Sequence, residues 1–448
     1  MLGLIDNSRR LIPIPGLART ECPPRLVLTE FDSFEAARTI RDEWDRFAER
    51  IGGDVFATFD WCAVWWRHFS SGRTLRIYTA RRDRELVAVI PVFREAIRWG
   101  PVSIHVVRVV GTDHAGTRCC PLFDPAICDE LATALFEALN RDGVWDVFHI
   151  GDLPGYFMHA REFAAALQRA AKCHRVYLRD GYCPHAVFEV PDDFESFLSR
   201  LSGNERKNIR KSERRLTESV ALRTFCVSRE DLPFAFEELC RWHRDHWQAR
   251  GELGFIDKWP GAHAFHADIA AAQADAGRLR LLRLRAGEQT IGYIYSQRFG
   301  GRLHLFQSVR APDVQWDRFS PGRLLHCAAM RTAIDERLSQ VDAMSGFYEY
   351  KRRLGADFLR LKCVTAVHRR WSSRIRVGVF RAITAMIHLV YFRMWFSKLA
   401  PFLRRRLSEK SPRFLYAGMS RRHIRSRFVL DAFSGRSIEI NVADRPSE

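Results

Sequence analysis

The stretch that decides the fold runs from Gly277 to Asp357 and begins GRLRLLRLRAGEQTIGYIYSQRFGGRLHLFQS, residues 277–308. Its apolar and aromatic runs predict three consecutive strands, at residues 279–284, 291–299 and 303–308. A loop then leads to SPGRLLHCAAMRTAIDERL, residues 320–338, which predicts a helix. The stretch closes with VDAMSGFYEYKRRLGAD, residues 341–357, where a strand precedes a polar cluster.

The start of the predicted helix has the pattern of an anion site. Ser320 suits the N-cap and Pro321 suits the first helical position. The first N–H groups of a helix have no partners within it and lie at the positive end of its dipole, so a phosphate fits beside Gly322. Arg318 and Arg323 flank this point and can add charge-assisted hydrogen bonds. Many ordinary core helices also begin with Ser-Pro, so the anion site depends on the polar cluster downstream.

That polar cluster supplies groups that can move protons. Asp342 ends the predicted strand, and Glu349, Tyr350 and Lys351 follow it closely. Carboxylates and phenols are the side chains that accept or donate a proton when a nucleophile attacks and a leaving group departs. The alternative is structural, with Glu349 and Lys351 as a surface ion pair and the tyrosine as half-buried packing. The grouping of these residues favours a site.

These motifs, taken in order, resemble the GNAT-superfamily branch of cellulose-biosynthesis (CelD-type) acyltransferases, which is related to the Fem-type aminoacyltransferases. The resemblance covers roughly residues 55 to 370. Its main motifs are Gly277-Arg278-Leu279, Ser320-Pro321-Gly322, Asp342, Gly346 and Glu349-Tyr350-Lys351. Upstream, it adds Phe59-Asp60-Trp61, the basic run from Asn204 to Lys211, and Trp242-His243-Arg244. Several motifs in the right order are more specific than any one of them.

The resemblance implies an acyl-CoA-dependent transferase, most simply an acetyltransferase that uses acetyl-CoA and no metal. In that chemistry Asp342 or Glu349 is the candidate base, directly or through water, and Tyr348 or Tyr350 is the candidate acid. Lys351 would neutralise a phosphate or a carboxylate, or hold Glu349. His243 is a second candidate base, because its helix faces the same cleft in relatives. The resemblance also implies a sugar or polysaccharide precursor as acceptor, in envelope or exopolysaccharide synthesis.

The order of predicted strands and helices repeats once along the chain, which indicates an α/β fold. With the resemblance, the repeat implies two tandem GNAT-like halves with mixed sheets flanked by helices. We expect the first half to open with a helix over residues 33–50 and to lack the Ser-Pro-Gly start. The predicted segments are an extended leader at 1–30, an N-terminal half at 31–185, a C-terminal acyltransferase half at 186–370, and a basic amphipathic tail at 371–448.

Composition limits the choice of partner and compartment. The chain of 448 residues has a net charge of +18 and 47% hydrophobic residues, which suits a large basic enzyme and anionic partners. Its eleven cysteines show no disulfide or zinc spacing, as expected for reduced thiols in a cytoplasmic protein. The sequence has no P-loop, dinucleotide-binding or nucleophile-elbow motif.

Two other functions stay open, and the tail adds a third partner. A Fem-type transferase would take its aminoacyl group from tRNA; nucleic acid is otherwise an unlikely partner, because the basic run at 206–215 lacks interleaved aromatics. A non-catalytic subunit of a polysaccharide-synthesis complex would keep the fold alone. Residues 374–406 predict an amphipathic helix that either packs on the enzyme or lies at an anionic membrane surface, which would place the protein at the inner face of the membrane.

Overall fold

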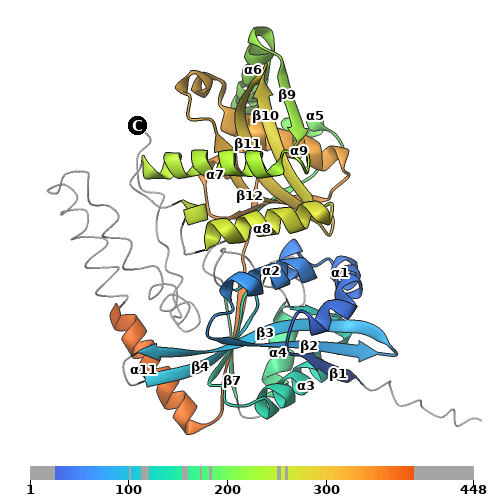
Figure 1. The fold of residues 1–448 in the computed structure, drawn as a ribbon, viewed down its shortest axis with the longest axis vertical. Coiled ribbons are helices and arrows are strands. Elements are labelled where there is room, and N and C mark those ends of the chain that lie inside the picture. Colours follow the sequence, from blue (N-terminus) through green and yellow to red (C-terminus); the bar gives the residue numbers. More distant parts are fainter. Residues whose placement is uncertain are drawn as a thin grey trace, which may run out of the picture.

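The chain forms two α/β lobes stacked on one another, and each lobe is built on a mixed sheet (Figure 1). This arrangement confirms the predicted α/β class and its two tandem halves. The start of the predicted leader, residues 1–25, and the tail beyond residue 387 lie outside the described residues. The computed structural model describes residues 26–99, 102–112, 121–153, 160–171, 174–180, 184–249, 254–257 and 261–387.

The first sheet has eight strands in the order β1-β2-β3-β4-β6-β15-β7, with β5 paired to β3. Only β4 and β6 run parallel. Helices α3 (Cys128–Arg141) and α4 (Ala160–Ala170) pack on one face, and α1 (Arg41–Arg50) and α2 (Phe59–Phe69) pack on the other. The strands are β1 Val27–Phe31, β2 Arg73–Arg82, β3 Glu85–Trp99, β4 Val102–Val109, β5 Leu122–Phe123, β6 Val147–Leu153, β7 Arg175–Asp180 and β15 Lys362–Val367.

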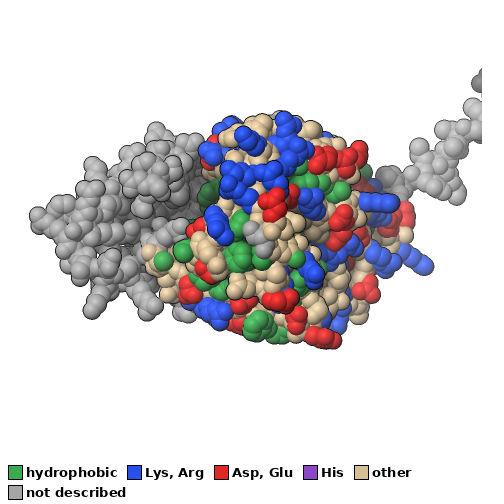
Figure 2. Space-filling view, turned by 90° about the horizontal axis from the view of Figure 1, so that it is seen from above, with side chains coloured by type: hydrophobic (Ala, Val, Ile, Leu, Met, Phe, Trp, Pro, Cys, Tyr) green, Lys and Arg blue, Asp and Glu red, His purple; other side chains and the backbone are tan. Residues whose placement is uncertain are grey.

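The second sheet has seven strands in the order β14-β8-β13-β12-β11-β10-β9, and again only one pair, β12 and β13, runs parallel. Its strands are β8 His185–Glu189, β9 Leu222–Cys226, β10 Leu279–Ala286, β11 Gln289–Phe299, β12 Arg302–Arg310, β13 Gln340–Ser345 and β14 Asp357–Leu359. Its helices are α5 Phe194–Arg200, α6 Gly203–Ser219, α7 Leu232–Gln248, α8 Ala262–Asp275, α9 Pro321–Asp335 and α10 Glu349–Arg353. Lys and Arg side chains gather at the end of the molecule where α6 lies (Figure 2).

The first sheet takes one strand from an unexpected part of the sequence. Strand β15 follows the strands of the second sheet in the chain, yet it inserts between β6 and β7 of the first sheet. The segment that carries β15 thus returns to the first lobe after the second is complete. The sequence pattern did not indicate this return, because an apolar strand can fill a gap in either sheet.

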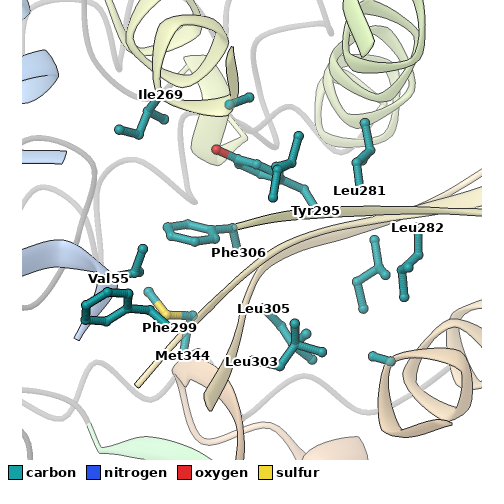
Figure 3. Packing of buried hydrophobic residues seen from close by; sticks show 14 of the residues in the cluster. Val55, Ile269, Leu281, Leu282, Tyr295, Phe299, Leu303, Leu305, Phe306 and Met344 are labelled. Carbon is teal, nitrogen blue, oxygen red and sulfur yellow. The ribbon is translucent and has the colours of Figure 1, made fainter. Parts of the chain in front are cut away.

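The two lobes share one hydrophobic core. Trp61 of α2 stacks on Phe306 of β12, with ring centroids 5.4 Å apart, and contacts Phe265 of α8 edge-on at 5.6 Å. Figure 3 shows Phe306 and Tyr295 on the side of the sheet that faces this contact. Polar links border the core: Arg278 pairs with Asp45 across the lobes at 2.7 Å. The halves therefore form one body rather than two loosely tethered domains.

The predicted helix at residues 33–50 is wrong in its first part. Residues Ala36–Ile40 form a tighter 3-10 turn, η1, and the α-helix begins only at Arg41. The backbone of Ile40, with φ −106° and ψ 9°, separates the two. Strand β3 extends to Trp99, because residues 94–99 pair along β4.

Candidate functional site

The site begins where the two parallel strands of the second sheet separate. Strands β12 and β13 pair only from Arg302 to His304, against residues 340–342. Beyond this point β12 follows β11 as far as Arg310, whereas β13 follows β8. No further rung joins them among the described residues. The edge of β12 past His304 is therefore left without a strand partner on that side.

The Asp342 side chain stabilises a β-bulge at the point where β13 stops pairing with β12. Its Oδ1 accepts the backbone N–H of Met344 at 2.8 Å, and the register of β13 shifts between Asp342 and Ser345. Met344 takes a left-handed backbone with φ 61°, which is uncommon for a residue with a side chain. The Asp342 carboxylate is fully buried and lies 3.4 Å from Nδ1 of His185. The structure thus gives Asp342 a shaping role in the bulge.

The start of α9 differs from the predicted capped helix. Ser320 occupies the N-cap position, but it has φ 53° and ψ 58° and its side chain makes no capping hydrogen bond. Side-chain capping needs an extended N-cap residue, and the preceding 3-10 turn η6, Val314–Phe319, brings the chain in through a left-handed one. The Ser320 carbonyl accepts the N–H of Arg323 at 2.9 Å instead.

The first turn of α9 is open to an anion. A Cβ atom built on Gly322 would meet nothing within 4 Å, so the space beside this residue is free. Pro321 has no N–H, and the first turn carries no acidic side chain. Helix α3 of the first half differs, because Asp124 caps the 3-10 turn Pro125–Ile127 that precedes it and Asp129 lies in its first turn. Of these two helix starts, that of α9 is therefore the one suited to phosphate.

The two arginines that flank this turn have different surroundings. The Arg323 guanidinium pairs with Glu205, which is 6% exposed and belongs to α6. This pair ties α6 to α9, so the charge of Arg323 is largely engaged. Arg318 is exposed and lies against the Phe319 ring, with 4.7 Å from its guanidinium carbon to the ring centroid. Of the two arginines that were predicted to contact an anion, Arg318 is therefore the more accessible.

Lys351 locks α10 to the bulged end of β13. Its ammonium group donates to the carbonyls of Ala343 at 2.8 Å and Ser345 at 3.1 Å, and the side chain is 3% exposed. Glu349 does not hold Lys351 in the predicted pair: it accepts from Arg352 and Arg353 on the helix surface. Hydrogen bonds from these arginines lower the pKa of Glu349 to about 2, so its carboxylate is a weak proton acceptor.

Tyr350 of α10 carries a protonated phenol and packs against α9. Its ring lies 5.2 Å from that of His326 on α9 and 5.9 Å from that of Tyr348. Partial burial raises the pKa of Tyr350 to about 12, so the phenol keeps its proton at neutral pH. Burial, followed by the charge of Lys351, lowers the pKa of His326 to about 4. His326 could not be predicted from the sequence, because no motif marks a histidine inside an apolar helix.

His243 lies apart from this cluster. It is 2% exposed and packs against Trp247 and Gly254. Burial lowers the pKa of His243 to about 4. The structure thus places the predicted second base between α7 and α8, whereas Asp342, Tyr350 and Lys351 meet around β13 and α10.

The first lobe reaches the base of the diverging strands through Asp54. This aspartate is 1% exposed and lies 3.9 Å from Nε2 of His304. His304 stands directly opposite Asp342 on the last paired rung. The sequence analysis missed both Asp54 and His304, because the contact joins residues 250 positions apart.

Two searches of the described residues bear on cofactor and membrane. None of the helices within those residues is long and apolar enough to cross a bilayer. In the same part of the chain, no three His, Cys, Asp or Glu side chains converge as a metal site would require.

Comparisons with known proteins concern the domain in the second half and the fold. Residues 203–352 match the family model described as an acetyltransferase (GNAT) domain, which spans from α6 into α10. FemX has a similar solved structure, with a TM-score of 0.55 at 11% identity over 72% of this chain and 95% of that chain. A tandem GNAT protein from the clavulanic acid biosynthesis pathway gives 0.39 at 14% identity over 77% and 98%. No curated protein matches the sequence.

Residues 203–352 of the second half thus match a GNAT domain model, and the fold is similar to that of FemX. The domain match supports an acyltransferase. It covers the α9 start, the bulge of β13 and most of α10, and it leaves the first lobe and helix α11 (Trp371–Ile387) outside.

Proposed function

We propose that this protein is an acyl-CoA-dependent acyltransferase that transfers an acetyl or related acyl group to a sugar or glycan precursor. The observation that carries the proposal is the open first turn of α9, a helix that packs on the diverging β12 and β13, with the Tyr350 ring against His326 of the same helix. The acceptor class and a role in cellulose or other polysaccharide synthesis follow from the sequence resemblance alone.

The donor would bind through its phosphates and its extended arm. The pyrophosphate of the CoA thioester would sit at the N–H of Gly322 in the first turn of α9, with Arg318 as a further contact. The arm contains two amides, and the unpaired edge of β12 past His304 offers backbone groups of the matching kind. Gly322 leaves room for the phosphates without any rearrangement.

The reaction would be a direct transfer. The acceptor oxygen or nitrogen attacks the thioester carbonyl, the new C–O or C–N bond forms, and the C–S bond breaks. Tyr350 donates its proton to the departing thiolate, and the acceptor loses its proton to a base through water. Asp342 stays the candidate base, while Lys351 and the bulge position the α10 residues around the reacting carbonyl.

One observation favours a second function, the transfer of an aminoacyl group from tRNA. Helix α6 carries Lys207, Lys211 and Arg214 on its exposed side, and the Glu205–Arg323 pair fixes this helix beside the α9 start. A charged tRNA brings both a phosphate backbone and a reactive ester to such a surface. A third possibility, a non-catalytic subunit of a polysaccharide-synthesis complex, predicts no turnover at all.

Binding of CoA tests the proposal. We expect calorimetric titration to show CoA binding to the wild-type protein and to Gly322→Ala, because a Cβ meets no atom there. Gly322→Glu should abolish binding, since it places bulk and negative charge at the positive end of the helix dipole. If CoA bound Gly322→Glu as tightly as the wild type, the assignment of its phosphates to the start of α9 would be wrong.

A second measurement separates the candidate functions. Release of free thiol from acetyl-CoA in the presence of sugar acceptors would support the acyl-CoA function. Thermal protection by charged tRNA but not by acetyl-CoA would favour the aminoacyl function. Absence of turnover with either donor would favour the non-catalytic subunit.

A further inference from the structure

Helix α11, Trp371–Ile387, closes one face of the first sheet with its inner side. Val377 and Phe380 are buried there, together with Ile104 and Val106 of β4 and Val147 of β6. Arg376 is anchored as well, because its guanidinium lies 3.2 Å from the Asp146 carboxylate. The inner side of α11 therefore fixes the orientation of the whole helix.

The outer side of α11 is also apolar. Trp371 is 75% exposed, Ile375 54%, Val379 37% and Met386 58%. Residues spaced by four and seven positions fall on one face of an α-helix, and these four form a continuous line. A helix that needs only its inner side for the core has no structural reason to carry a tryptophan and three aliphatic side chains outward.

Positive charge surrounds this line. Arg374 and Arg381 are exposed along one side of it, and Arg369 and Arg370 precede the helix. The sequence has no Asp or Glu between Asp357 and Glu409, whereas it has twelve Lys and Arg in that interval. An apolar line beside arginines matches the headgroup region of an anionic bilayer, where tryptophan and aliphatic side chains enter the interface and arginines meet lipid phosphates.

We propose that the outer face of α11, formed by Trp371, Ile375, Val379 and Met386 with Arg374 and Arg381, is a contact surface for an anionic lipid membrane. Charge favours a membrane over two other partners that could cover this face. A second copy of the chain would bring arginines against arginines across a symmetric contact. Residues 388–408 of the same chain carry only positive charges and would meet the same repulsion. The proposal is independent of the reaction assigned above.

Sedimentation of the full chain with vesicles tests this surface. We expect binding to vesicles that contain phosphatidylglycerol, weaker binding to pure phosphatidylcholine, and weaker binding at 1 M salt than at about 0.1 M salt. Ile375→Glu with Val379→Glu should lower the partition coefficient on the order of ten-fold or more, because two charges would enter the apolar interface. Phe234→Glu is the matched control, since Phe234 is 69% exposed on α7.

A second variant covers the case in which the first one fails to fold. Arg374→Glu with Arg381→Glu changes two exposed side chains and should lower binding to anionic vesicles by about ten-fold or more. Wild-type protein that stays unbound at low salt would overturn the proposal, as would unchanged binding by folded variants. A dimer that either pair of substitutions dissociates would overturn it in favour of contact between two copies.

Discussion

At the scale of single residues, Lys351 and Ser320 occupy the predicted positions but make different bonds. Both were singled out for polar chemistry. The Lys351 ammonium donates hydrogen bonds to the backbone carbonyls of residues 343–345 and so fixes the backbone of the site. Ser320 turns the chain into α9 through its backbone, not its hydroxyl. Sequence motifs identify where such residues occur, and their bonds depend on the backbone around them.

Substitution of Tyr350 tests its role as a proton donor. Tyr350→Phe keeps the ring on His326 but removes the proton donor, so turnover of acetyl-CoA should fall by about 10²-fold without a change in melting temperature. Tyr348→Phe is the control and should stay near the wild-type rate. Since a pKa of about 12 keeps the phenol protonated at every lower pH, its ionisation should cause no loss of rate between roughly pH 7 and 9. Undiminished turnover by Tyr350→Phe would assign the tyrosine to packing.

At the scale of elements, the site depends on how closely α9 approaches the sheet. A Cβ on Gly292 of β11 would lie 2.8 Å from Cδ1 of Leu325 and 3.0 Å from the carbonyl oxygen of Val309. Glycine at this position therefore lets α9 rest on β11 and β12. The same close packing sets the first turn of α9 beside the point where β13 departs.

Gly292→Val should consequently destabilise the protein by about 1–3 kcal/mol, because the added side chain overpacks the contact between α9 and the sheet. Gly378→Ala is the control: a Cβ there meets nothing within 4 Å in α11, so stability should hold or rise slightly. Urea denaturation measures both. A Gly292→Val midpoint equal to that of the wild type would show that the helix can shift outward at no cost.

At the scale of the whole molecule, the two lobes are joined by a core and by β15. Trp61, Phe265 and Phe306 come from three elements in the two lobes, and all three are buried. The Asp54–His304 contact adds a polar link at the base of the site. A substitution that weakens the contact between the lobes should therefore lower the stability of both lobes.

Trp61→Ala tests this coupling. Removing a buried tryptophan should cost about 3–5 kcal/mol, and the loss should lower one shared unfolding transition. Circular dichroism and tryptophan fluorescence should give the same midpoint during thermal unfolding. Two separate transitions, of which only one moves, would mean that the lobes unfold independently.

The sequence by itself determined the α/β class and the location of α9 and β13, because alternation, turn residues and the Ser-Pro-Gly start are local signals. It also grouped Asp342, Tyr350 and Lys351, which lie within ten positions. Only the tertiary structure decided that His326 joins them and that His243 does not. It also decided that β15 returns to the first sheet, because contacts between distant residues depend on packing that no local pattern records.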